Sequence, residues 1–235
     1  MDSEKLKERI EDLYRIFACY YPPKLTLGDS SNEKWIPVLK TKRLRALASD
    51  EVGRYTFSAM TTCGTEEDFK ALLPRIFELC ASNSKFGANL EIAVGKLAYG
   101  NWTHWPEKEQ KACFNFCHCW WACAVRERAS GDPSELICAM GQIFEDLGPF
   151  LKEWVQAFKE GFQEPLLEFV KENAPLLVKR RQIKNSFWAR REKQKKQVVD
   201  WLLQHRTIEI LEASPALQNE SYLFAVNALR VASEP

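Results

Sequence analysis

The chain has 235 residues and a net charge of +1, and 46% of its residues are hydrophobic, including eight Trp and fourteen Phe. This is enough apolar material for a substantial core, in one large domain or two small ones. Only ten Gly and eleven Pro are present, too few for the frequent turns of an all-β protein. We therefore expect an all-α protein, an irregular multi-helix bundle or array of about eight helices.

The N-terminus suggests a location inside the cell. The segment MDSEKLKERIED is charged throughout and lacks the basic start and apolar run of a secretory signal. No run of about eighteen apolar residues occurs, so we expect no transmembrane segment. We therefore expect a cytoplasmic protein whose eight cysteines are reduced thiols rather than a disulfide framework.

Hydrophobic periodicity predicts five helices in the first half of the chain. The third has the clearest pattern, and Thr65 to Asp68 before it fits a capping box. Pro and Gly between residues 22 and 43 indicate an irregular connection. The five predicted helices span residues 3–19, 50–62, 65–80, 89–99 and 107–128.

A Ser-Gly-Asp-Pro break at residues 130–133 separates the two halves and marks an internal boundary at 129–134. In the second half we expect a long, protruding helix over residues 180–212 and a last helix that ends near Val231. We divide the chain into an acidic helical body, residues 1–178, and a basic part, residues 179–235, packed on that body as one domain. The other predicted helices of this half span residues 134–147, 150–162 and 164–173.

Residues 111–123, KACFNFCHCWWAC, contain four cysteines and raise the question of a metal or redox site. On a helix, Cys113 and Cys117 lie within about 40° of each other, whereas Cys119 points roughly 200° away from Cys117. Tetrahedral zinc needs four ligands around one point, which a straight helix with this spacing does not supply. We interpret the segment as the interior of a bundle and expect no metal and no cofactor.

Two other segments are candidates for chemistry. Cys63 precedes a predicted helix N-terminus, where the helix dipole favours a reactive thiolate, although a turn closed by Gly64 explains it equally. The turn at residues 100–106 brings Trp102, His104 and Trp105 together, as in an aromatic-walled pocket with an imidazole acid or base. The alternative is that the two tryptophans pack the turn. No phosphate loop, nucleophile elbow or metalloprotease motif accompanies these residues.

The strongest functional signal is a basic segment. Residues 179–197 contain nine Lys and Arg and one acid, Glu192, for a charge of +8, so the rest of the chain carries −7. Such clusters contact phosphates, and Phe187 and Trp188 are candidates for stacking on unpaired bases. The alternative is a solvated or internally paired helix face. The candidate nucleic-acid-binding residues are Lys179, Arg180, Arg181, Lys184, Trp188, Arg190, Arg191, Lys195 and Lys196.

Two stretches, GTEEDFKALLPRIFEL at residues 64–79 and GNWTHWPEKEQKA at residues 100–112, resemble a family of uncharacterised bacterial proteins. The resemblance covers mainly residues 50–125. It implies a bacterial cytosolic protein and, since no activity is established for that family, assigns no catalytic residue.

These observations lead to three functional hypotheses. The first is a non-enzymatic regulatory, immunity-type or adaptor module that binds an unknown protein partner, because tryptophan anchors interfaces well and catalytic motifs are missing. The second is a nucleic-acid-binding or other polyanion-binding protein that uses the basic segment. The third is an enzyme centred on the His104 turn or on Cys63.

Overall fold

The structure is a computed structural model that describes residues 2–25, 35–82, 88–127 and 131–234. Every regular element within these ranges is a helix, which confirms the predicted all-α class. The described ranges contain twelve α-helices rather than about eight. One short helix lies in the expected irregular connection and another within the expected long helix. None of the described helices is long and apolar enough to cross a membrane.

The contacts between helices divide the chain into two compact units. The first contains Met1–Cys123 and Ala129–Gly131, and the second contains Asp132–Pro235 together with Ala124–Arg128. The division therefore falls beside the break that the sequence places at residues 129–134. Residues 132–178 and 179–235 belong to the same unit.

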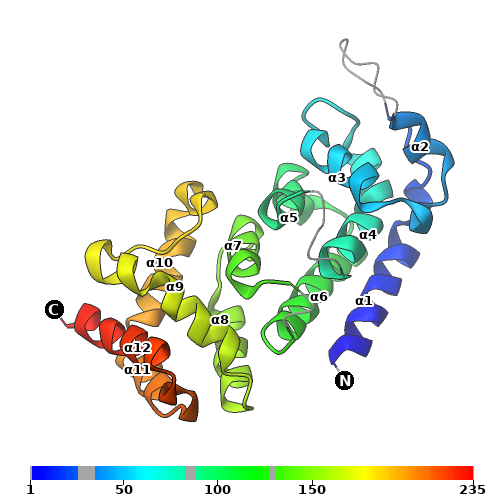
Figure 1. Cartoon of the computed structure of the whole chain (residues 1–235). Helices are drawn as coiled ribbons and strands as arrows, with labels where there is room; N and C mark the ends of the chain where they lie inside the picture. The colour runs from blue at the N-terminus through cyan, green and yellow to red at the C-terminus, as the bar shows by residue number, and fades with distance from the viewer. Residues whose placement is uncertain (1, 26–34, 83–87, 128–130, 235) are drawn as a thin grey trace. The chain divides into compact units, whose positions relative to one another are not determined.

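The first unit is built around α4, which packs against α1, α3 and α5 (Figure 1). The predicted capping box is confirmed, because Asp68 accepts a hydrogen bond from the Thr65 N–H and its own N–H donates to the Thr65 hydroxyl. The apolar face predicted for this helix is buried. The α-helices of this unit are α1 (Asp2–Phe17), α2 (Ile36–Thr41), α3 (Ser49–Ser58), α4 (Glu66–Ser82), α5 (Leu90–Tyr99) and α6 (Glu107–Ala124).

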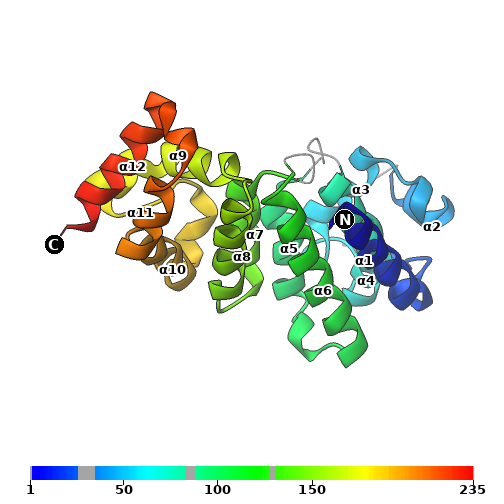
Figure 2. The ribbon, with the colours of Figure 1, turned by 90° about the horizontal axis from the view of Figure 1, so that it is seen from below.

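The second unit contains a pair of neighbouring parallel helices, α9 and α12, which lie side by side in both views (Figures 1 and 2). The Tyr222 hydroxyl donates to Glu168 near one end, and Arg181 reaches the Glu234 carbonyl at the other. Trp154 is buried in the core of this unit. The α-helices are α7 (Pro133–Ile143), α8 (Gly148–Lys159), α9 (Glu164–Arg180), α10 (Glu192–Leu202), α11 (His205–Glu212) and α12 (Glu220–Ser233).

The prediction of one long helix over residues 180–212 is wrong. The chain forms the end of α9, a turn, a 3₁₀ helix η5 (Ser186–Arg190), and then α10 and α11. Two residues with positive φ, Arg181 at 50° and Asn185 at 90°, reverse the chain between α9 and η5. Along this path the side chains of Ile183 and Trp188 are both buried in the unit.

Candidate anion-binding pocket

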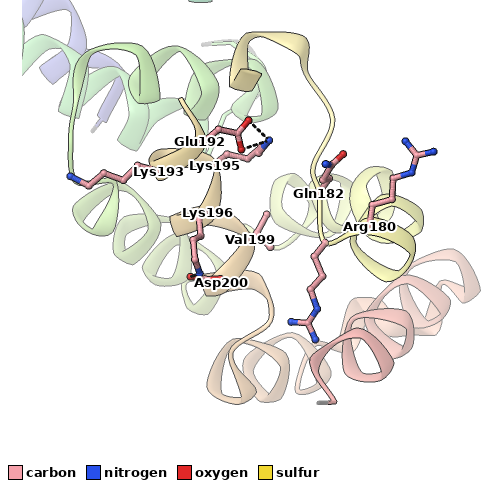
Figure 3. Close-up of a pocket in the computed structure, with 9 residues that line it drawn as sticks. Arg180, Gln182, Glu192, Lys193, Lys195, Lys196, Val199 and Asp200 are labelled. Atoms are coloured by element: carbon pink, nitrogen blue, oxygen red, sulfur yellow. Dashed lines mark hydrogen bonds and ion pairs between the residues drawn. The ribbon is translucent and has the colours of Figure 1, made fainter. Parts of the chain in front are cut away.

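An open pocket of about 660 Å³ lies in the second unit, between the C-terminal end of α9 and α10 (Figure 3). Five of its lining residues are cationic and two are acidic, so the lining has a net positive charge. The lining residues are Arg180, Arg181, Gln182, Glu192, Lys193, Lys195, Lys196, Val199 and Asp200. Four of the five cations are candidate nucleic-acid-binding residues from the sequence analysis. The fifth, Lys193, lies in the same basic segment but is not one of those candidates.

The turn that forms one wall of the pocket is held by a buried amide. Arg181 closes α9 in the left-handed conformation, and its N–H donates to the Leu177 carbonyl at 2.9 Å, as in the αL capping motif. The Asn173 side chain accepts from the Lys184 N–H at 2.6 Å and donates to the Phe169 carbonyl at 2.8 Å. The backbone that carries Arg181 and Lys184 is therefore fixed to the inner face of α9.

The other wall is α10, which is oriented by glutamine side chains. Gln197 accepts from the Leu147 N–H at 2.7 Å and donates to the Glu145 carbonyl at 2.8 Å, while the buried Gln194 donates to the Phe144 carbonyl. Both amides bind the segment between α7 and α8. Lys193 and Lys196 of the same helix are exposed.

Three lysines of α10 form ion pairs with exposed carboxylates. Lys195 Nζ lies 2.7 Å from Glu192, and Lys196 pairs with Asp200 on the same helix; Figure 3 shows the first of these pairs beside the pocket. Lys193 Nζ lies 3.1 Å from Glu145. Ion pairs between exposed side chains contribute only about 0–1 kcal/mol. Lys193 and Lys196, whose pairs are exposed on both sides, can therefore exchange their present partners for a stronger anion at small cost, whereas the Lys195 side chain is only 16% exposed.

The remaining cations have fewer partners. Within the part of the chain that the structure describes, the exposed Lys179, Arg180, Lys184 and Arg190 form no ion pair. Arg191 is half-buried and donates to the Gln142 carbonyl at 2.6 Å. We use the name basic surface for Lys179, Arg180, Arg181, Lys184, Arg190, Arg191, Lys193, Lys195 and Lys196. All nine lie on α9, on α10 or between them.

Trp188, which the sequence places among the candidate binding residues, lies inside the second unit with 2% of its surface exposed. A Cβ atom added at Gly141 of α7 would lie 2.7 Å from the Trp188 ring, so the indole packs directly on this glycine. Phe187 is half-buried. We therefore leave Trp188 out of the basic surface, since a base has no access to its ring.

The His104 turn separates its residues. Trp102 and Trp105 are buried, whereas His104 is exposed with Nδ1 3.2 Å from the Thr103 hydroxyl. The Trp105 indole N–H donates to the Gly100 carbonyl at 2.8 Å, which closes the turn. The two tryptophans thus pack this turn, and the imidazole points to the outside of the unit.

The cysteine residues are mostly part of the core. Cys113, Cys117 and Cys123 are buried and Cys119 is half-buried, which confirms that residues 111–123 lie largely in the interior. Burial raises the pKa of the Cys113 and Cys117 thiols, so both are protonated at neutral pH. Among the described residues no three Cys, His, Asp or Glu side chains converge as metal ligands. Cys63 is also buried, behind Gly64 at φ +72°.

A buried charge cluster in the first unit is a feature that the sequence pattern does not reveal. Lys70 Nζ lies 2.7 Å from Glu66 and 3.1 Å from the buried Glu109, above the Trp105 ring. Burial alone would lower the pKa of Lys70, but the two carboxylates outweigh it and raise the pKa. Every charge in the cluster therefore has an opposite neighbour.

The chain matches no family model, no curated protein and no solved structure. The resemblance noted over residues 50–125 therefore stays a prediction. A function has to rest on the chemistry of the described residues, and the basic surface is the part of the chain where that chemistry is most specific.

Proposed function

We propose that this protein is a non-enzymatic nucleic-acid-binding protein that binds through its basic surface. The observation that carries the proposal is the pocket between α9 and α10, where five cations line one concavity against two exposed acids. Nucleic acids carry regularly spaced phosphates that Lys and Arg neutralise with release of counterions. A concave, positively charged wall beside four cations without ion pairs is suited to such a ligand.

An anionic membrane fits the basic surface less well. Membrane-surface segments insert apolar side chains below the lipid head groups in addition to their basic contacts. Of the large apolar side chains in the basic segment, Ile183 and Trp188 are buried and Phe187 is half-buried. This leaves charge as the main attraction that the segment offers.

An acidic protein partner is disfavoured for a related reason. Protein interfaces depend on a few apolar or aromatic anchors that become buried at the centre of the contact. The apolar residue that lines the pocket is Val199, which is already buried. A ligand that needs no such anchor, and whose charges are dense and repeated, suits this surface best.

The test is fluorescence polarisation of a labelled 20-nucleotide duplex DNA or single-stranded RNA, titrated with the protein at several salt concentrations. We expect log Kd to change with log salt by about 0.9 for every duplex phosphate that is neutralised. The triple variant R180E/K184E/R190E removes three cations that have no ion pair, so the slope should fall by about 1 for each lost phosphate contact.

The matched control is K108E/K111E/K159E, which changes the net charge by the same amount at exposed lysines of α6 and α8 outside the basic surface. If binding weakens equally in both variants, net charge alone is responsible and the basic surface is not the site. If the wild type binds neither ligand at low salt, the proposed function is wrong.

A second candidate function, a protein-interaction module, is favoured by a different observation. On α12, Phe224 and Val231 are 76% and 63% exposed, and at a spacing of seven residues they share one face of the helix. Exposed large apolar side chains on one face are typical of interaction sites. This face would supply the anchors that the basic surface lacks.

The test of this candidate function is a pull-down from a cell extract, which compares the proteins that bind to the wild type with those that bind to F224D/V231D. The control S221D/N227D introduces the same charge at exposed polar positions of α12. A partner that the wild type and the control retain and F224D/V231D loses would support the candidate. Identical sets for all three proteins would refute it.

A further inference from the structure

Resting on the proposed function, we infer that the basic surface recognises the phosphate backbone of nucleic acids and does not read bases. The inference concerns the class of ligand: any sufficiently long nucleic acid, with little dependence on sequence. It follows from which side chains the basic segment exposes and which it uses internally.

The basic segment offers few aromatic rings for stacking on bases. Proteins that hold single strands by their bases place exposed aromatic rings along a basic groove. The two aromatic residues of the segment do not offer such rings, because Trp188 is buried against Gly141 and Phe187 is half-buried. The Phe187 carbonyl also accepts from Gln142 at 3.4 Å, which ties this residue to α7. Stacking therefore contributes nothing from Trp188 and little from Phe187.

The basic segment offers few exposed amide groups for reading base edges. Asn and Gln read adenine through the two ends of their amide groups. Both ends of Asn173 and of Gln197 are engaged in hydrogen bonds within the unit, and Gln194 is buried. Gln182 is the exposed amide that lines the pocket. A single amide gives little sequence discrimination.

Three of the five cations that line the pocket are lysines on α10, and a lysine ammonium acts on phosphate as a point charge without the planar fork that matches a guanine edge. Arg180 and Arg181 lie at the C-terminal end of α9, where the chain turns. These positions suit contacts along a backbone, since they belong to two walls of a concavity rather than to one projecting helix.

The experiment is a competition assay with the full chain and a labelled 20-base-pair duplex. The unlabelled competitors are two duplexes of equal length, one A·T-rich and one G·C-rich, and the single strands dT20 and dA20. We expect the two duplexes to compete within about threefold of each other, less than the roughly fivefold that the weakest bidentate base contact gives. We expect the same for the two single strands.

The variant Q182A, which removes the exposed amide of the pocket, should leave the ratio of affinities between the two duplexes and between the two single strands unchanged. A preference above about fivefold for one duplex or one single strand overturns the inference while the proposed function stands. A preference that Q182A abolishes identifies Gln182 as a base reader and also overturns it. Absence of binding to every nucleic acid overturns both proposals.

Discussion

The acids beside the pocket give the sharpest prediction. Glu192 and Asp200 pair with Lys195 and Lys196 on α10, so they compete with any bound phosphate for these two ammonium groups. The double variant E192Q/D200N removes both acids without altering side-chain size. The charge of the pocket lining then rises by two, because its five cations are no longer opposed by carboxylates.

The expected size of the effect follows from the geometry. Ion pairs at helical spacings of three and four residues contribute about 0.3–0.5 kcal/mol each. A ligand that no longer has to displace them should bind roughly three- to fivefold more tightly, since 1.4 kcal/mol corresponds to a factor of about ten. If both freed lysines reach phosphates, the salt slope for duplex DNA should also steepen by about 1.8.

The assay is the salt titration by fluorescence polarisation, with circular dichroism to check that the variant stays folded. E209Q/E220Q, which neutralises two exposed acids outside the pocket, is the control and should leave the slope unchanged. An E192Q/D200N protein that is folded but binds with the wild-type slope and affinity would refute the role of these lysines. Weaker binding would mean that the acids support the site.

Three further predictions concern the scaffold. W188A should lower the free energy of unfolding by about 3–5 kcal/mol in urea titrations, because it empties a buried aromatic site; a loss below about 1 kcal/mol would mean that the indole is not packed as described. E109Q removes one buried partner of Lys70 and should lower the free energy of unfolding by about 3 kcal/mol. An unchanged free energy of unfolding would contradict this and would mean that Glu66 alone satisfies the lysine. Burial alone would raise the pKa of Asp68, but hydrogen bonds from Leu25, Thr65 and Lys24 outweigh it and lower the pKa. The stability that Asp68 contributes is therefore present above its ordinary pKa of 3.8 and is lost as pH falls through the lower folded-state value. D68N should have a lower free energy of unfolding than the wild type at pH 7, and this difference should shrink at a pH below the folded-state pKa of Asp68. A difference that is the same in urea titrations at pH 7 and at that acidic pH would contradict this prediction.

Helices with long apolar periods could be predicted well from the sequence. The helix predicted to begin after Thr65 matches α4 (Glu66–Ser82) closely, because a capping box and a buried face point to the same element. The helix expected at residues 164–173 instead continues to Arg180, through Pro175. The six-residue α2 was not predicted, since one and a half turns contain too few periodic positions to stand out.

The path of the basic segment could not be predicted, and this changes the candidate site. Ile183, Phe187 and Trp188 have a spacing that also fits a helical face, so the sequence alone favours one long helix. The turn is instead stabilised by the hydrogen bond that the Lys184 N–H donates to the Asn173 side chain, and by the packing of Trp188 on Gly141. Both are tertiary interactions that local periodicity does not contain. The cations were found because charge is visible in the sequence, whereas the pocket depends on the turn.

The pairing of α9 with α12 has a consequence for how the protein is made. Tyr222 and Glu234 in or beside α12 hold the two helices together near both ends, and α12 follows α9 by about forty residues of chain. During translation α9 therefore emerges from the ribosome well before the helix that covers its side. The basic segment is synthesised before α12, so the hydrogen bond between Arg181 and the Glu234 carbonyl can form only after residue 234 has emerged.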